Sequence, residues 1–180
     1  EVLLPNPGYA CYDNFVRTFH GKPTGYEVPA STGFHYDPVL IGKLISPRSK
    51  AILVNSPSNP TAAVQDHSTL EEIAALGVPV ISDEIYHGLE YGAADTRAVS
   101  MLEVTDECFV VDGLSKRYAM TGLRVGWLIA PQSLVAPLQR LQQNLFVCAS
   151  SLAQTAAIAA LREGEEALTA MTEQYKRRRE

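Results

Sequence analysis

Residues 113–127 read GLSKRYAMTGLRVGW, a largely polar stretch that begins directly after one apolar run and ends within another. The run before it is Cys108–Val111, and the run at its end is Val125–Ile129. Continuous apolar runs of this length, bounded by turn residues, are typical of buried strands. The link between the two runs is too short for a helical crossover, so we expect the second strand to run antiparallel to its neighbours.

The same pattern extends outward along the chain, where further apolar runs alternate with helical patterns. This alternation predicts an α/β fold, a mostly parallel sheet with helices on both faces. The other strands are expected at Val2–Leu4, Ala51–Val54 and Val78–Ser82, with a weaker candidate at Tyr26–Val28. Two helices carry capping signals: one runs from Pro38 to about Ile45 with Asp37 as N-cap, and one runs from a capping box at Ser68–Glu71 to Gly77. The other helices are expected at Tyr12–Phe19, Ser133–Phe146, Ser151–Leu161 and Glu165–Glu180.

The composition is that of an ordinary globular protein. Hydrophobic residues make up 46% and charged residues 19% of the 180 residues, and the net charge is -5. This charge gives no general attraction to nucleic acid or to anionic lipid, and no apolar run reaches the length of a membrane span. Cys11, Cys108 and Cys148 form no CxxC pair, so we expect no metal site, no disulfide framework and a cytoplasmic location.

Polar and aromatic residues collect directly after the expected strands, in the segments Pro5–Tyr9, Asn55–Thr61, Asp83–Tyr86 and Asp112–Arg117. In open α/β sheets, ligands bind outside the carboxyl ends of the strands. A pocket there would hold an aromatic plane, an amide, a carboxylate, a phenol and an amine. Pyridoxal-phosphate (PLP) chemistry needs these groups, because the aldehyde reacts with a lysine amine and the pyridine nitrogen needs a carboxylate partner.

The stretch 113–127 resembles the lysine signature of the class I/II aminotransferases, PLP-dependent enzymes of fold type I that include aspartate aminotransferase. Asn59–Thr61 and Asp83–Tyr86 are similar to two further motifs of that family, in the same order, and the resemblance covers essentially the whole chain. It implies an aminotransferase that moves an amino group between an amino acid and a 2-oxo acid, as a homodimer. It also implies that the strands lie side by side in the order 125–129, 108–111, 79–82, 51–54, 1–4 and 26–28.

The resemblance implies catalytic roles for residues at three strand ends. Lys116 would hold PLP as a Schiff base and would then move the proton between the substrate α-carbon and the cofactor. Asp83 would pair with the pyridinium nitrogen. Asn59 and Tyr86 would bond the ring oxygen.

Further cofactor contacts are implied for Tyr9, which would stack on the ring, and for Arg124 and Ser115, which would help to hold the phosphate. The chain departs from the family pattern at two positions. Gly113 stands where a serine or threonine often binds the phosphate, and Ala62 stands where glycine usually follows the Asn-Pro-Thr motif, which suggests a different turn there.

We expect residues 1–180 to be a PLP-binding large domain that is a fragment of a longer protein. The chain begins directly in an apolar run and stops inside a helical pattern. The upstream segment that cups the phosphate in this family, and the C-terminal small domain that binds the substrate carboxylate, have no counterpart in it. Two alternatives stay open: a PLP-dependent C–S β-lyase, and an aminotransferase-like sensor domain of a transcription regulator.

Overall fold

The computed structural model describes residues 1–90 and 97–179. Within them, six strands form one sheet in the order β2-β1-β3-β4-β5-β6. The strands are β1 (Val2–Asn6), β2 (Pro23–Glu27), β3 (Ala51–Asn55), β4 (Val80–Asp83), β5 (Cys108–Gly113) and β6 (Gly126–Ile129). All neighbours pair in parallel except β5 and β6, which are antiparallel. Both the strand order implied by the resemblance and the reversed direction of β6 are therefore confirmed.

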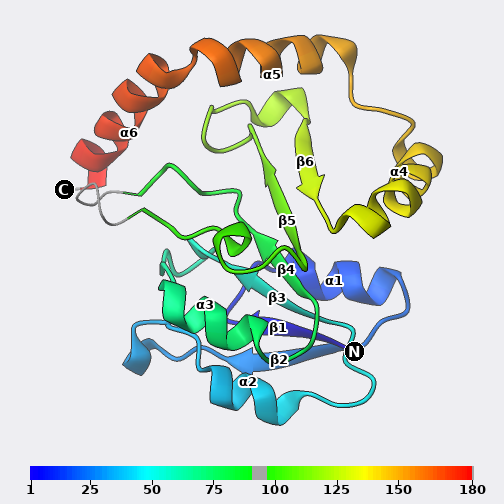
Figure 1. Ribbon diagram of the computed structural model, residues 1–180. Coiled ribbons are helices and arrows are strands. Elements are labelled where there is room, and N and C mark those ends of the chain that lie inside the picture. The colour runs from blue at the N-terminus through cyan, green and yellow to red at the C-terminus, as the bar shows by residue number, and fades with distance from the viewer. Residues whose placement is uncertain (91–96, 180) are drawn as a thin grey trace.

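Helices cover both faces of the sheet, as expected (Figure 1). On one face lies α1 (Cys11–Thr18), and on the other lie α2 (Pro38–Leu44) and α3 (His67–Ala74). The last third of the chain forms α4 (Gln132–Phe146), α5 (Ser151–Glu163) and α6 (Glu165–Arg179), which arch around the β5–β6 side in Figure 1. The expected end of the last helix, Glu180, lies outside the described residues.

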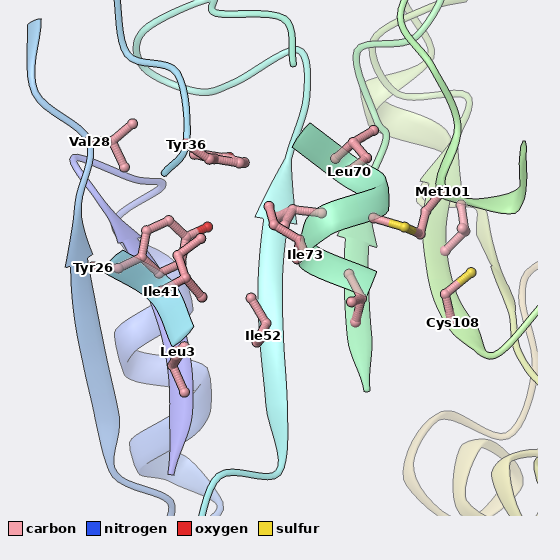
Figure 2. Close-up of a cluster of buried hydrophobic side chains, with 13 residues drawn as sticks. Leu3, Tyr26, Val28, Tyr36, Ile41, Ile52, Leu70, Ile73, Met101 and Cys108 are labelled. Atoms are coloured by element: carbon pink, nitrogen blue, oxygen red, sulfur yellow. The ribbon is translucent and has the colours of Figure 1, made fainter. Parts of the chain in front are cut away.

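The main hydrophobic core lies between the sheet and the α2–α3 face. Figure 2 shows Ile41 of α2 and Ile73 of α3 directed onto strand residues such as Leu3 and Ile52. Each of these four side chains is at most 1% exposed. Burying a side chain of this size contributes about 1.5–3 kcal/mol, so this core holds the strand ends in fixed positions.

Two helix starts test the capping predictions, and one of the predictions was wrong. Asp37 caps α2 as expected, because its Oδ1 accepts from the backbone amides of Val39 and Leu40 at 2.9 and 3.1 Å. The capping box at Ser68 is not formed. Asp66 caps α3 instead, accepting from the Thr69 amide at 2.7 Å and from the Ser68 hydroxyl at 2.8 Å. A carboxylate two residues earlier thus outcompetes the serine for the free amides.

The outer helices leave an extended apolar surface. Within the described residues, α4 buries no side chain, and large apolar side chains of α4, α5 and β6 are exposed: Leu128, Ile129, Leu134, Val135, Leu141, Leu145, Phe146, Leu152, Ile158 and Leu161. Exposed large apolar side chains in this number are typical of a face that packs against further polypeptide.

Candidate active site

The polar ends of β3 and β4 lie side by side, because the parallel register pairs Asn55 with Asp83. Asn55 is 1% exposed and donates from Nδ2 to the Asp83 carbonyl oxygen at 2.8 Å. Its Oδ1 accepts from the Asn59 amide at 2.7 Å. The Tyr36 hydroxyl also binds the Asn55 backbone, donating to its carbonyl at 2.9 Å and accepting from its amide at 3.0 Å. Asn55 therefore fixes both the end of β4 and the loop that carries Asn59.

The Asp83 carboxylate is oriented by two donors. The Tyr12 hydroxyl of α1 donates to Oδ2 at 2.6 Å, and the Ile85 amide donates to Oδ1 at 3.2 Å. Burial, and then the Asp83 charge, raise the pKa of Tyr12 far above its usual value, so the phenol stays protonated and acts as a donor. A carboxylate has about four acceptor sites, so Asp83 can accept from a further donor.

Tyr9 lies at the same sheet edge, next to the Asp83 partner. Its ring meets the Tyr12 ring edge-to-face, with centroids 5.4 Å apart and an interplanar angle of 80°. Both tyrosines line a cavity of about 230 Å³, together with Asn6 and Gly8. Tyr9 itself is exposed. Tyr12 therefore supports Asp83, while Tyr9 remains available to a ligand.

Asn59 and Tyr86 form a second polar pair, from the loops that follow β3 and β4. Asn59 Nδ2 donates to the Tyr86 hydroxyl at 3.2 Å. Both residues line an open cavity of about 990 Å³, a volume suited to a cofactor-sized molecule. Through Asn55, this pair is connected to Asp83, so three of the predicted site residues belong to one hydrogen-bonded group.

Lys116, Ser115 and Arg124 lie in the link between β5 and β6. Lys116 is exposed, Ser115 is partly buried and Arg124 is exposed. Arg124 Nη1 donates to the Thr121 carbonyl at 2.9 Å. In the described part of the chain, these three side chains make no hydrogen bond with the other candidates and line neither cavity. The structure thus brings Asp83, Asn59 and Tyr86 together and places Tyr9 near them. Among the described residues, no side-chain hydrogen bond joins Lys116, Ser115 or Arg124 to this group.

The structure shows the surroundings of Gly113 and Ala62, the two positions at which the chain departs from the family pattern. A Cβ atom at Gly113 would lie 3.0 Å from the Gly126 Cα across the β5–β6 pair, so a larger residue would strain this pairing. Ala62 has a φ of 58°, in the left-handed region that glycine enters most easily. Alanine therefore does not move this turn out of the glycine-type conformation.

Comparison with known proteins places this chain in a family. The aminotransferase class I and II family matches residues 1–180. The chain belongs to this family. Its members generally depend on PLP.

Curated relatives of the chain are named as aminotransferases. The chain is 37% identical, over 99% of its length, to a (5-formylfuran-3-yl)methyl phosphate transaminase of Methanocaldococcus jannaschii, and covers 46% of that protein. It is 36% identical, also over 99% of its length, to an aspartate aminotransferase of Streptomyces avermitilis, and covers 45% of that one. The chain therefore spans about half the length of the curated relatives it matches.

Solved structures agree with the fold. An aminotransferase from Mycobacterium tuberculosis matches 99% of the chain with a TM-score of 0.91 and 32% identity, over 50% of its own chain. The aspartate aminotransferase of Thermus thermophilus, solved with maleate, matches 98% of the chain with a TM-score of 0.89 and 32% identity, over 46% of its own. The mostly parallel sheet of this chain thus has an aspartate-aminotransferase-type fold. None of the helices described here is long and apolar enough to cross a membrane.

Sequence reasoning assigned no role to Tyr12 and Asn55. Asn55 carried a usable signal, since it is the first polar residue after a buried run, as Asp83 is. Tyr12 carried none, because the evident apolar residues of this segment, Phe15 in α1 and Phe19 directly after it, are exposed while Tyr12 is buried. Only the packing of α1 on the sheet brings the Tyr12 hydroxyl to Asp83.

Proposed function

We propose that the full-length protein is a PLP-dependent aminotransferase that moves an amino group between an amino acid and a 2-oxo acid. The single observation that carries this proposal is the hydrogen-bonded group of Asp83, Asn55, Asn59 and Tyr86 at adjacent strand ends. Family membership and the names of the relatives support it. Residues 1–180 would form the large cofactor-binding domain.

The donor and acceptor chemistry of these residues fits PLP. Asp83, held by the Tyr12 hydroxyl, would accept a hydrogen bond from the pyridinium nitrogen and keep it protonated. The amide of Asn59 and the phenol of Tyr86 would both bind the ring oxygen. Tyr9 would stack on the ring. When bound, PLP supplies an electron sink for the charge that develops at the substrate α-carbon.

Lys116 is the proposed covalent attachment site and proton carrier. Lys116 is an exposed residue, and within the described residues no hydrogen bond of its side chain would compete with the cofactor. As a free amine, it would take a proton from the substrate α-carbon and deliver it again on the cofactor side. Arg124 and Ser115, in the same β5–β6 link, would contribute to phosphate binding.

The remaining parts of the proposal concern the longer protein. The relatives are about twice the length of the chain. In the full-length protein, segments corresponding to their additional residues would complete the phosphate site and bind the substrate carboxylate. The exposed apolar surface of α4, α5 and β6 would pack against such segments or against a second subunit of a homodimer. Three free cysteines among the described residues fit a cytoplasmic location.

An assay of the full-length protein with PLP separates the candidate functions. An aminotransferase converts a 2-oxo acid into the corresponding amino acid while the donor amino acid becomes a 2-oxo acid. A C–S β-lyase instead releases pyruvate, ammonia and a thiol from a cysteine conjugate, without an amino acceptor. A sensor domain would bind PLP and catalyse neither reaction. The comparisons do not favour the latter two, and amino transfer is the expected result.

Removing the Tyr12 hydroxyl should impair catalysis through Asp83. In the full-length protein, Tyr12→Phe is expected to lower kcat/KM for amino transfer roughly tenfold, because a hydrogen bond to a charged group contributes about 1.5–3 kcal/mol. Tyr26→Phe is the matched control, since it removes another buried phenol bond, donated to the Leu53 carbonyl at 2.8 Å. Equal losses of activity in both variants would show that Tyr12 contributes to stability alone.

A further inference from the structure

His87 connects the two loops that carry Asn59 and Tyr86. Its ring nitrogen Nε2 lies 2.8 Å from the Ser56 carbonyl oxygen, and because a carbonyl can only accept, Nε2 is the donor. Ser56 lies in the loop after β3, three residues before Asn59. His87 directly follows Tyr86 in the loop after β4. The imidazole therefore spans the same gap as the Asn59–Tyr86 hydrogen bond.

The other ring nitrogen of His87 faces a buried carboxylate. Nδ1 lies 3.5 Å from Glu84 Oε2, and the Glu84 side chain is 5% exposed. The second carboxylate oxygen, Oε1, is held in place by the Ser82 hydroxyl at 2.9 Å and by the Met101 amide at 2.8 Å. Glu84 is thus anchored to the sheet and to the segment around Met101, and it limits the rotation of the His87 ring.

Two other charged groups face this turn. Burial raises the pKa of Asp112, at the end of β5, above its usual value, although the Gly113 amide and the nearby His87 act in the opposite direction. The Arg117 side chain packs on Gly88, because a Cβ atom added to Gly88 would lie 2.8 Å from Arg117 Nε. His87 is therefore enclosed by groups from β4, β5 and the lysine link, and its side chain is only 16% exposed.

We propose that His87 is a positioning residue, which holds the β3 and β4 loops at the separation at which Asn59 and Tyr86 together bind the cofactor ring oxygen. The inference rests on the proposed PLP-dependent function. The Asn59–Tyr86 distance of 3.2 Å is at the long end of the hydrogen-bonding range, so a small increase in loop separation removes this contact. The His87–Ser56 bond, at 2.8 Å, is the shorter and more rigid link between the same loops.

Two amide substitutions in the full-length protein separate the two contacts of His87. The amide nitrogen of His87→Gln reaches the position of Nε2 and can still donate to the Ser56 carbonyl, whereas that of His87→Asn reaches only the position of Nδ1. We expect His87→Gln to bind PLP much like the wild type. We expect His87→Asn to bind it roughly tenfold more weakly.

The visible absorption of the lysine-bound cofactor gives a second measurement. Hydrogen-bond donors to the ring oxygen draw electron density away from the protonated nitrogen that links Lys116 to the cofactor. They therefore lower the pH at which this nitrogen loses its proton and the absorption of the cofactor changes. His87→Asn should therefore raise this pH midpoint by about one unit, while His87→Gln should leave it near the wild-type value. His35→Asn, at an exposed histidine on another loop, is the matched control and should change neither quantity.

A double-mutant cycle with Tyr86→Phe tests the route of the effect. If His87 acts through the ring-oxygen pair, His87→Asn should weaken PLP binding little further when Tyr86 is already phenylalanine. Additive losses of PLP binding in the double variant would overturn the assignment of His87, and so would equal behaviour of His87→Gln and His87→Asn. If the wild-type protein still binds PLP in that case, the proposed function stands. Failure of the wild-type protein to bind PLP would overturn both.

Discussion

Replacing Lys116 by alanine in the full-length protein is expected to abolish covalent PLP attachment and to lower the rate of amino transfer by roughly 10⁴-fold or more. Two losses combine in this variant. The amine that forms the Schiff base is gone, and so is the group that moves the substrate α-proton, which alone contributes about 10²- to 10⁴-fold. Absorbance spectra of the purified protein with PLP, and single-turnover rates with an amino acid, measure the two losses separately.

The matched control for this variant is Lys43→Ala, at an exposed lysine in the last turn of α2, far from the strand ends. This variant should keep both the spectrum and the rate of the wild type. A Lys116→Ala protein that retained a near-normal rate would show that the proton carrier lies elsewhere.

Replacing Asp83 by alanine should leave PLP bound, because Lys116 and the phosphate contacts remain, but should lower kcat by roughly 10²- to 10³-fold. Loss of one member of a buried ion pair costs about 3–5 kcal/mol, and here the unpaired member would be the protonated pyridine nitrogen. Without its carboxylate partner, the ring loses its proton and no longer withdraws electrons. PLP content and kcat, measured on the same preparation, distinguish weak binding from weak chemistry.

Asp37→Asn is the matched control for this substitution, since it removes an exposed carboxylate that only caps α2 and replaces it with another good N-cap residue. It should leave kcat unchanged. The account of Asp83 fails if the alanine variant loses PLP entirely but turns over normally when PLP is in excess.

The sheet was predictable because its strands are short continuous apolar runs. Each of β1, β3 and β5 includes the expected run and continues into the residues that follow, ending at Asn6, Asn55 and Gly113. The strand β4 begins at Val80, two residues later than expected, and ends at Asp83. The antiparallel direction of β6 followed from the short link after Val111. Their spatial order came from the family resemblance and not from the periodicity of the runs, since no local pattern states which strands are neighbours.

The candidate site was predictable only where a strand end places a residue directly. Asp83 is the last residue of β4, Asn59 lies in the loop after β3, and the structure connects them through Asn55. The contacts of Tyr12 and His87 depend on how distant segments pack, over sequence separations of 71 and 31 residues. Local pattern carries no information on such contacts, which explains why neither residue was assigned a role. The same limit applies to the start of α3, where only side-chain geometry decides between Asp66 and Ser68 as the cap.

The most direct test of the central claim is reduction of the full-length protein with borohydride in the presence of PLP, followed by proteolysis and mass spectrometry of the peptides. The reagent converts a Schiff base into a stable amine and so marks the attachment site permanently. Our account predicts a single major adduct on the peptide that contains Lys116. An adduct on any other lysine, or none in a protein that catalyses amino transfer, would contradict it.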